Sequence, residues 1–207
     1  MKNPLHYQIT EYDCGPTSLV NGISYLFDRE EIPPEIVRNI MLYSLDGYGP
    51  DGVSGKSGTS HTAMLFLSHW LEGFGKTGRL AIRSAYLSGH AVNLGQNSRL
   101  RDALARGGAA VARVDLEGWH YVLLTGMAGE SVHLFDPYRI TECPFPVAGV
   151  QADERHPEAY NRIVPAALLE RETASPYALG PVEEREAVLL FNANTVMTAE
   201  ETVEYMI

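Results

Sequence analysis

The segment AAVARVDLEGWHYVLLTGMAGESVHLFD, residues 109–136, decides the fold class. It holds three short runs of apolar, β-branched and aromatic residues, at 109–114, 119–126 and 131–136. The turn-like sequences DLEG and MAGE separate the runs. Short β-prone runs with turns between them predict an antiparallel meander of strands.

The chain before this segment has a helical pattern. Apolar residues recur at helical spacing from about 14 to 28, after Pro33 and Pro34, after a cap at Thr59 or Ser60, and from 98 to 106. Helices followed by an antiparallel sheet indicate an α+β domain, with N-terminal helices packed on the sheet.

The chain after the meander carries weaker signals. We expect a strand at 187–191 and a final amphipathic helix that begins at Thr198, whereas the polar stretch at 149–162 has no clear pattern. With 207 residues and no internal repeat, we expect one domain spanning 1–207.

Composition excludes several classes of function. A net charge of -10 with scattered cations gives no basic patch for nucleic acid or acidic membranes. No apolar run approaches the roughly 18 to 20 residues of a membrane span, and the first residues lack a secretory signal, so we expect a soluble, cytoplasmic protein. Two cysteines form neither a disulfide framework nor a thiolate zinc site.

Two glycine-rich stretches resemble phosphate-binding loops but lack the required context. GFGKTG at 73–78 matches GxGxxG, yet an expected helix precedes it where a strand is needed, so we interpret the glycines as a helix end. GPDGVSGKS at 49–57 departs from the Walker A pattern at Pro50. The surrounding stretch, 46–60, is predicted to be a surface connection or a lid.

Cys14 is the first candidate for chemistry. It stands before Gly15 and Pro16, where the first expected helix begins. Most free cysteines pack as small hydrophobes. A helix N-terminus and a neighbouring imidazolium, however, stabilise the reactive thiolate, so Cys14 is a nucleophile if a base lies beside it.

The hairpin in 119–136 supplies that base. If it closes about Ala128, His120 faces Asp136 on one face of the sheet. A carboxylate so placed fixes the tautomer and orientation of the imidazole, while the other ring nitrogen faces the thiol. The alternative is that His120 and Asp136 form a cross-strand pair with a structural role only.

The other histidines and the second cysteine are weaker candidates. His133 is predicted on the face opposite Asp136, and His61 and His69 lack the partners of a zinc pair. No helix follows Cys143. We interpret all four as core or surface residues.

Gln8 is a candidate oxyanion donor. A tetrahedral acyl intermediate needs preorganised donors, typically a backbone N–H and a side-chain amide, each worth roughly two to three decades in rate. Gln8 lies six residues before Cys14 and could supply the amide. Its alternative interpretation is an exposed polar residue near the start of the sequence.

Together these motifs resemble the bacteriocin-processing cysteine peptidases that cut after double-glycine leaders, a family of the papain-like superfamily. Gln8, four intervening residues, then Asp13, Cys14 and Gly15 are similar to its opening motif. HYVLLTGMAGESVHLFDP at 120–137 is similar to its histidine strand and terminal Asp-Pro. The resemblance covers two blocks, about 7–28 and 109–138.

The resemblance implies a papain-like cysteine peptidase fold and a peptide or protein substrate. Cys14 would be the nucleophile, His120 the general base and acid, and Asp136 the orienting carboxylate. Gln8 and the Cys14 amide would form the oxyanion hole, with no metal or organic cofactor. The alternatives are an acyltransferase or transpeptidase with the same triad, and a non-catalytic peptide-binding module.

Overall fold

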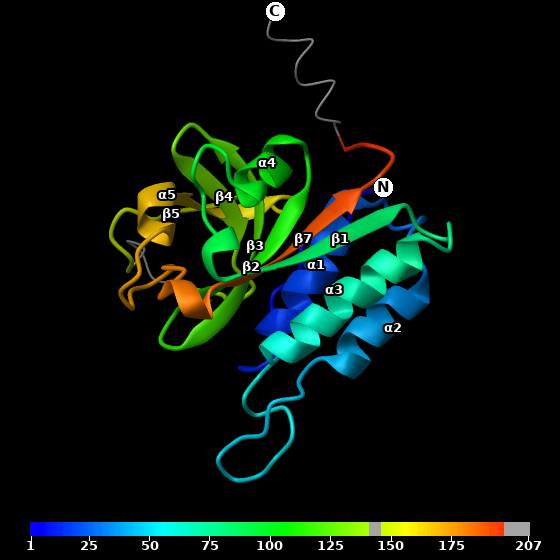
Figure 1. The fold of residues 1–207 in the computed structure, drawn as a ribbon, viewed down its shortest axis with the longest axis horizontal. Helices are drawn as coiled ribbons and strands as arrows, with labels where there is room; N and C mark the ends of the chain where they lie inside the picture. Colours follow the sequence, from blue (N-terminus) through cyan, green and yellow to red (C-terminus); the bar gives the residue numbers. More distant parts are fainter. Residues whose placement is uncertain (141–145, 197–207) are drawn as a thin grey trace, which may run out of the picture.

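The computed structural model describes residues 1–140 and 146–196, in which helices pack on one seven-stranded antiparallel sheet (Figure 1). The strand order across the sheet is β1-β7-β2-β3-β4-β6-β5. In chain order the elements are α1 (Cys14–Leu26), α2 (Pro34–Tyr43), α3 (His61–Gly75), β1 (Ile82–Ser88), η1 (Gly89–Ala91), α4 (Arg99–Ala105), β2 (Ala109–Asp115), β3 (Trp119–Ala128), β4 (Ser131–Phe135), β5 (Gln151–His156), β6 (Tyr160–Pro165), α5 (Ala166–Leu169), η2 (Val182–Glu184) and β7 (Glu186–Asn192). This arrangement confirms a mixed fold of helices and an antiparallel sheet.

The first four α-helices begin where the sequence predicts. Pro34 is the first residue of α2. The Ser60 hydroxyl caps α3 by accepting from the Ala63 N–H at 3.2 Å, and Ser98 caps α4 in the same way. No helix in the described residues is long and apolar enough to cross a membrane.

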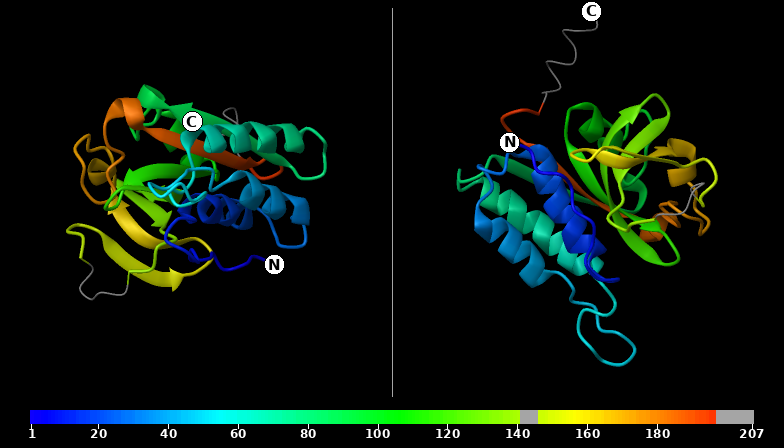
Figure 2. Two further views of the ribbon diagram at one scale, coloured as in Figure 1. Left: turned by 90° about the horizontal axis from the view of Figure 1, so that it is seen from below. Right: turned by 180° about the vertical axis from the view of Figure 1, so that it is seen from behind.

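The sheet has a hydrophobic core on each face. Helices α1, α2 and α3 lie together against one face, and α4 and α5 lie on the other (Figure 2). In the first core Leu19 and Ile23 of α1 are buried with Leu123 of β3. Helix α1 approaches the sheet closely, because a Cβ at Gly22 would lie 2.6 Å from Leu190. This packing fixes the N-terminal end of α1 relative to β3.

Sequence patterns missed three strands. The predicted strand at 187–191 is present as β7, but β7 lies between β2 and the unpredicted β1. The polar stretch at 149–162 contains β5 and the start of β6, which pair antiparallel. Residues of β5 are almost all exposed, so they show no alternation of apolar and polar side chains.

The GFGKTG motif belongs to the end of α3. Gly73 lies inside the helix and Gly75 is its last residue. A Cβ at Gly75 would lie 1.9 Å from the Ile82 carbonyl oxygen, so the close approach of β1 requires glycine there. These contacts agree with the structural interpretation of the motif. The expected helix at Thr198 and the second thiol, Cys143, lie outside the described residues.

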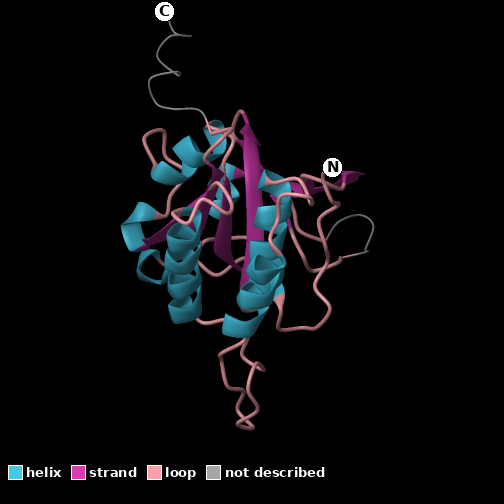
Figure 3. Cartoon of the chain, turned by 90° about the vertical axis from the view of Figure 1, so that its right-hand side faces the viewer, coloured by secondary structure: helices cyan, strands magenta, loops and turns pink. Residues whose placement is uncertain are grey.

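The connection between α2 and α3 is a long loop that projects from the body of the protein (Figure 3). It folds on itself through short backbone hydrogen bonds, among them Gly49 N–H to Val53 O at 3.0 Å and Gly55 N–H to Gly47 O at 2.7 Å. The C-terminal end of the loop, at Thr59, lies against α1.

Candidate active site

Cys14 is the first residue of α1 and is buried, with 7% of its surface exposed. The first N–H groups of a helix have no acceptor within the helix, so the thiol lies where partial positive charge gathers. The helix starts when Asp13 O accepts from Thr17 N–H at 3.0 Å. This is the position that the sequence predicts for the thiol.

Asp13 organises the turn that leads to Cys14. Its carboxylate accepts backbone N–H groups from Ile9 at 3.0 Å and from Thr10 at 2.6 Å, and the Thr10 hydroxyl as well. Burial would raise the pKa of Asp13, but these hydrogen bonds lower it below its usual value. Asp13 therefore stays charged and holds the turn between Gln8 and Cys14.

Gly15 allows the end of the long loop to touch α1 next to Cys14. A Cβ at Gly15 would lie 2.6 Å from the Thr59 Oγ1. The Thr59 carbonyl oxygen in turn lies 3.4 Å from the Tyr121 hydroxyl, on the strand that carries His120. Three segments that are distant in sequence thus meet at the start of α1.

His120 and Asp136 form a buried hydrogen-bonded pair. Nε2 of His120 lies 2.8 Å from Oδ1 of Asp136, with the His120 side chain 9% exposed and that of Asp136 fully buried. The Cys14 side chain lies close enough to His120 to raise the pKa of the imidazole. Because Nε2 is directed at Asp136, Nδ1 is the nitrogen left for the thiol. The structure therefore brings Cys14, His120 and Asp136 together.

The register that predicted this pair is wrong by two residues. Leu124 faces Leu134 rather than Val132, a bulge follows Leu124, and the turn lies at 129–130. On the His120 side of the bulge the displacement is two residues, which keeps the side chains there on their predicted face of the sheet, whereas at 126–128 the displacement is three. Asp136 follows the last residue of β4 and still reaches His120, by a diagonal contact that the predicted direct opposition did not describe.

The surroundings of His120 favour its protonated form. Burial alone would lower the pKa of His120, but hydrogen bonds with Asp136 and Cys14, and the charges of both groups, raise it to about 9. His120 is therefore held as an imidazolium at neutral pH, next to the Cys14 thiol.

Gln8 lies next to the segment that carries Asp136. Its backbone N–H donates to Pro137 O at 2.9 Å, next to Asp136 in the chain. Its Nε2 donates to Thr10 O at 2.7 Å, while Oε1 is buried without a hydrogen-bond partner. One of the two Nε2 hydrogens remains for an incoming oxygen.

Two residues that hydrogen-bond to Asp136 were not predicted from the sequence to belong to the site. Tyr177 donates its hydroxyl to Oδ2 of Asp136 at 2.5 Å. The side-chain amide of Asn161 accepts from the Asp136 N–H at 2.8 Å and donates to the Asp136 carbonyl at 2.9 Å. Neither residue lies in a recognisable motif, and only the fold brings them to the carboxylate.

Glu186 is a third unpredicted residue near the site. This buried carboxylate accepts the hydroxyls of Tyr121 at 2.6 Å and Tyr86 at 2.7 Å, and lies 3.3 Å from Arg113. Tyr121 directly follows His120 on β3. Glu186 therefore anchors the strand that carries the imidazole.

The remaining histidine candidates lie elsewhere. His133 and His156 stack on the two sides of Tyr160, with ring centroids 4.2 and 4.4 Å away. Within residues 1–140 and 146–196, no group of three or more His, Cys, Asp and Glu side chains could hold a metal ion.

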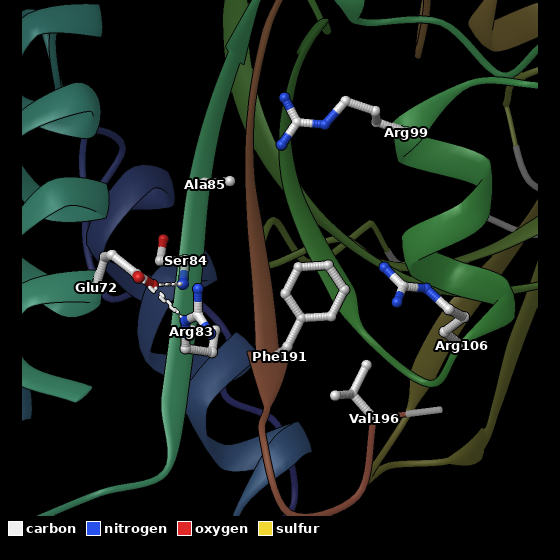
Figure 4. Close-up of a pocket in the computed structure, with 8 residues that line it drawn as sticks. All are labelled: Glu72, Arg83, Ser84, Ala85, Arg99, Arg106, Phe191 and Val196. Carbon is white, nitrogen blue, oxygen red and sulfur yellow. Dashed lines mark hydrogen bonds and ion pairs between the residues drawn. The ribbon is translucent and has the colours of Figure 1, made fainter. Parts of the chain in front are cut away.

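A separate pocket opens between α4 and the β1–β7 edge of the sheet (Figure 4). Phe191 of β7 lines it, five residues and so roughly 17 Å along the strand from Glu186. Glu72 binds Arg83 on its wall, and Asp102 pairs with Arg106 at 3.0 Å. These carboxylates compensate two of the cations, and the pocket shares no residue with the Cys14 site.

Comparisons with known proteins give a likeness to solved structures but none to a family model or a curated protein. No protein-family model matches the chain, and no curated protein matches it significantly. Among solved structures, a double glycine motif protease from an AMS/PCAT transporter, in complex with the leader peptide, is similar at 13% identity and a TM-score of 0.42. The likeness covers 91% of this chain and 89% of that chain.

Proposed function

We propose that the protein is a papain-like cysteine hydrolase that cleaves peptide bonds. One observation carries the proposal: at the N-terminus of α1, Cys14 lies beside a buried His120 whose Nε2 is 2.8 Å from Oδ1 of Asp136. Nucleophile, base and orienting carboxylate in this order are the requirement for thiol catalysis.

The first half of the proposed reaction forms an acyl-enzyme. The Cys14 thiolate attacks the substrate carbonyl carbon, and the resulting oxyanion accepts from the Cys14 N–H and the free Nε2 hydrogen of Gln8. The imidazolium of His120 then gives its Nδ1 proton to the leaving amine as the carbon–nitrogen bond breaks. The products are a free amine and a thioester on Cys14.

The second half returns the enzyme to its starting state. His120, now neutral, takes a proton from water, and the hydroxide attacks the thioester carbonyl. The carbon–sulfur bond breaks, a carboxylic acid leaves, and the thiolate–imidazolium pair is restored. Asp136 holds the imidazole through both halves and does not itself carry the proton.

The substrate is proposed to be a peptide, and an aromatic side chain lies next to the site. Tyr138 is about half exposed, and its ring meets the His120 imidazole edge-on at 6.4 Å. The resemblance of the Gln8 to Gly15 motif makes a leader peptide ending in two glycines the first substrate to test.

Mass spectrometry of the enzyme and its products tests this function. During cleavage, Cys14 should carry an acyl group as an intermediate. The same part of the peptide should then be released as a free carboxylic acid. With candidate amines present, amide products in place of the acid would instead identify an acyltransferase. Absence of both an acyl adduct and products across a peptide library would contradict the proposal.

The pH dependence of turnover follows from His120. Because its pKa is raised from 6.5 to about 9, the imidazolium persists through this interval and is lost as pH rises above it. We expect kcat for peptide cleavage to hold to about pH 9 and then fall, since the leaving amine loses its proton donor. An alkaline limb near pH 6.5, measured by initial rates, would contradict the role of the Asp136 and Cys14 contacts.

A further inference from the structure

Tyr177 hydrogen-bonds to the carboxylate oxygen of Asp136 that does not contact His120. Oδ1 accepts from His120 at 2.8 Å and from the Tyr138 N–H at 2.8 Å. Oδ2 accepts the Tyr177 hydroxyl at 2.5 Å. Burial, followed by the charge and hydrogen bond of Asp136, raises the pKa of Tyr177. The phenol therefore stays protonated and can only donate to the carboxylate.

The backbone around Tyr177 is held in a costly conformation. Its φ is +67°, in the left-handed region that non-glycine residues rarely adopt. Its N–H donates to Asp115 O at 2.7 Å, and Asp115 N–H donates to Ala178 O at 2.8 Å. Strained residues of this kind persist where the surrounding structure fixes them for a purpose. Here the turn is tied to the end of β2 and directs a fully buried ring at Asp136.

Arg162 is a buried cation near Tyr177. Arg162 is fully buried on β6, its Nη1 donates to Asn161 O at 2.8 Å, and its charge acts on the Tyr177 hydroxyl. A buried cation is costly unless an anion lies near it. Asp136 is an anion that also acts on Tyr177, so a polar chain runs from Arg162 through Tyr177 and Asp136 to His120.

We propose that Tyr177 is a positioning residue of the site, which holds Oδ2 of Asp136 so that Oδ1 faces Nε2 of His120. The segment after β6, which carries no recognisable motif, thereby acquires a role in activating the Cys14 thiol. The consequence for turnover rests on the function proposed above, whereas the effect on His120 does not.

A double-mutant cycle tests the proposal without substrate. The readout is the rate of iodoacetamide alkylation of Cys14 at pH 6, followed by mass spectrometry. Tyr177→Phe keeps the ring and removes only the hydroxyl, so we expect the rate to fall about tenfold through loss of a charge-assisted hydrogen bond. In an Asp136→Asn background the same change should alter the rate by less than about twofold, because the two residues act as a unit.

Tyr25→Phe is the matched control. It removes a hydroxyl that donates to Thr125 O at 2.9 Å, and the alkylation rate should stay within about twofold of the wild type. If Tyr177→Phe leaves the rate unchanged, or lowers it equally in both backgrounds, the positioning role is overturned.

A second readout separates this proposal from the function. The His120 Nε2–H, observed by NMR in histidine-labelled protein, should exchange with water about tenfold faster in Tyr177→Phe and unchanged in Tyr25→Phe. Faster exchange in a protein that cleaves no peptide would support positioning and overturn the hydrolase. Unchanged exchange in a protein that does cleave peptides would overturn positioning alone.

Discussion

Replacing Cys14 with serine is expected to lower kcat/KM for peptide cleavage by at least about 10⁴-fold. The substitution keeps the size of the side chain at the start of α1, where Cys14 is buried. A hydroxyl does not ionise beside an imidazolium as a thiol does, so the attacking anion is lost. Cleavage of a synthetic peptide, followed by chromatography, measures the effect.

The second thiol provides the control for this substitution. Cys143→Ser should keep kcat/KM within about twofold of the wild type, because the proposed mechanism assigns Cys143 no part in the reaction. A Cys14→Ser protein that folds like the wild type and retains a tenth or more of its activity would exclude thiol catalysis.

Replacing Asp136 with asparagine has the second largest expected effect, a loss in kcat of about 10³- to 10⁴-fold. An amide cannot match the carboxylate, which accepts from His120 on one oxygen and from Tyr177 on the other. The imidazole then loses the partner that fixes its tautomer and stabilises its charge. We expect KM to change little, since Asp136 is fully buried and does not reach the substrate.

Asp102→Asn is the matched control for this loss. Asp102 is exposed on α4 and pairs with Arg106 at 3.0 Å, so its replacement should leave kcat within about twofold. Steady-state rates of both variants decide the point. An Asp136→Asn enzyme that works as well as Asp102→Asn would show that the buried pair is structural only.

Local signals were enough to predict the first four α-helices and the central hairpin, but not the short helix α5. Ser60 and Ser98 cap helices because their hydroxyls accept N–H groups in the first turn, and this chemistry is readable in sequence. The hairpin carrying His120 and Asp136 was also predictable from local signals. An error of two residues in the register leaves His120 on the predicted face of the sheet, because side chains alternate between the faces.

Long-range contacts were not predictable. Strand β7 lies between β1 and β2, although about a hundred residues separate it from β1. Tyr177 reaches Asp136 only through a left-handed turn tied to the end of β2, and no periodicity encodes such a contact. The support of the site thus depends on tertiary packing, whereas its chemistry is visible in two short motifs.

The pairing of Cys14 with His120 is tested most directly by iodoacetamide labelling of both cysteines across pH, in the wild type and in His120→Ala. An ordinary thiol, with a pKa near 8.5, is only about 0.3% thiolate at pH 6. We predict that Cys14 reacts about 100-fold faster than Cys143 at pH 6, and that His120→Ala removes the difference. Equal, slow labelling of both thiols in the wild type would contradict an activated nucleophile at the start of α1.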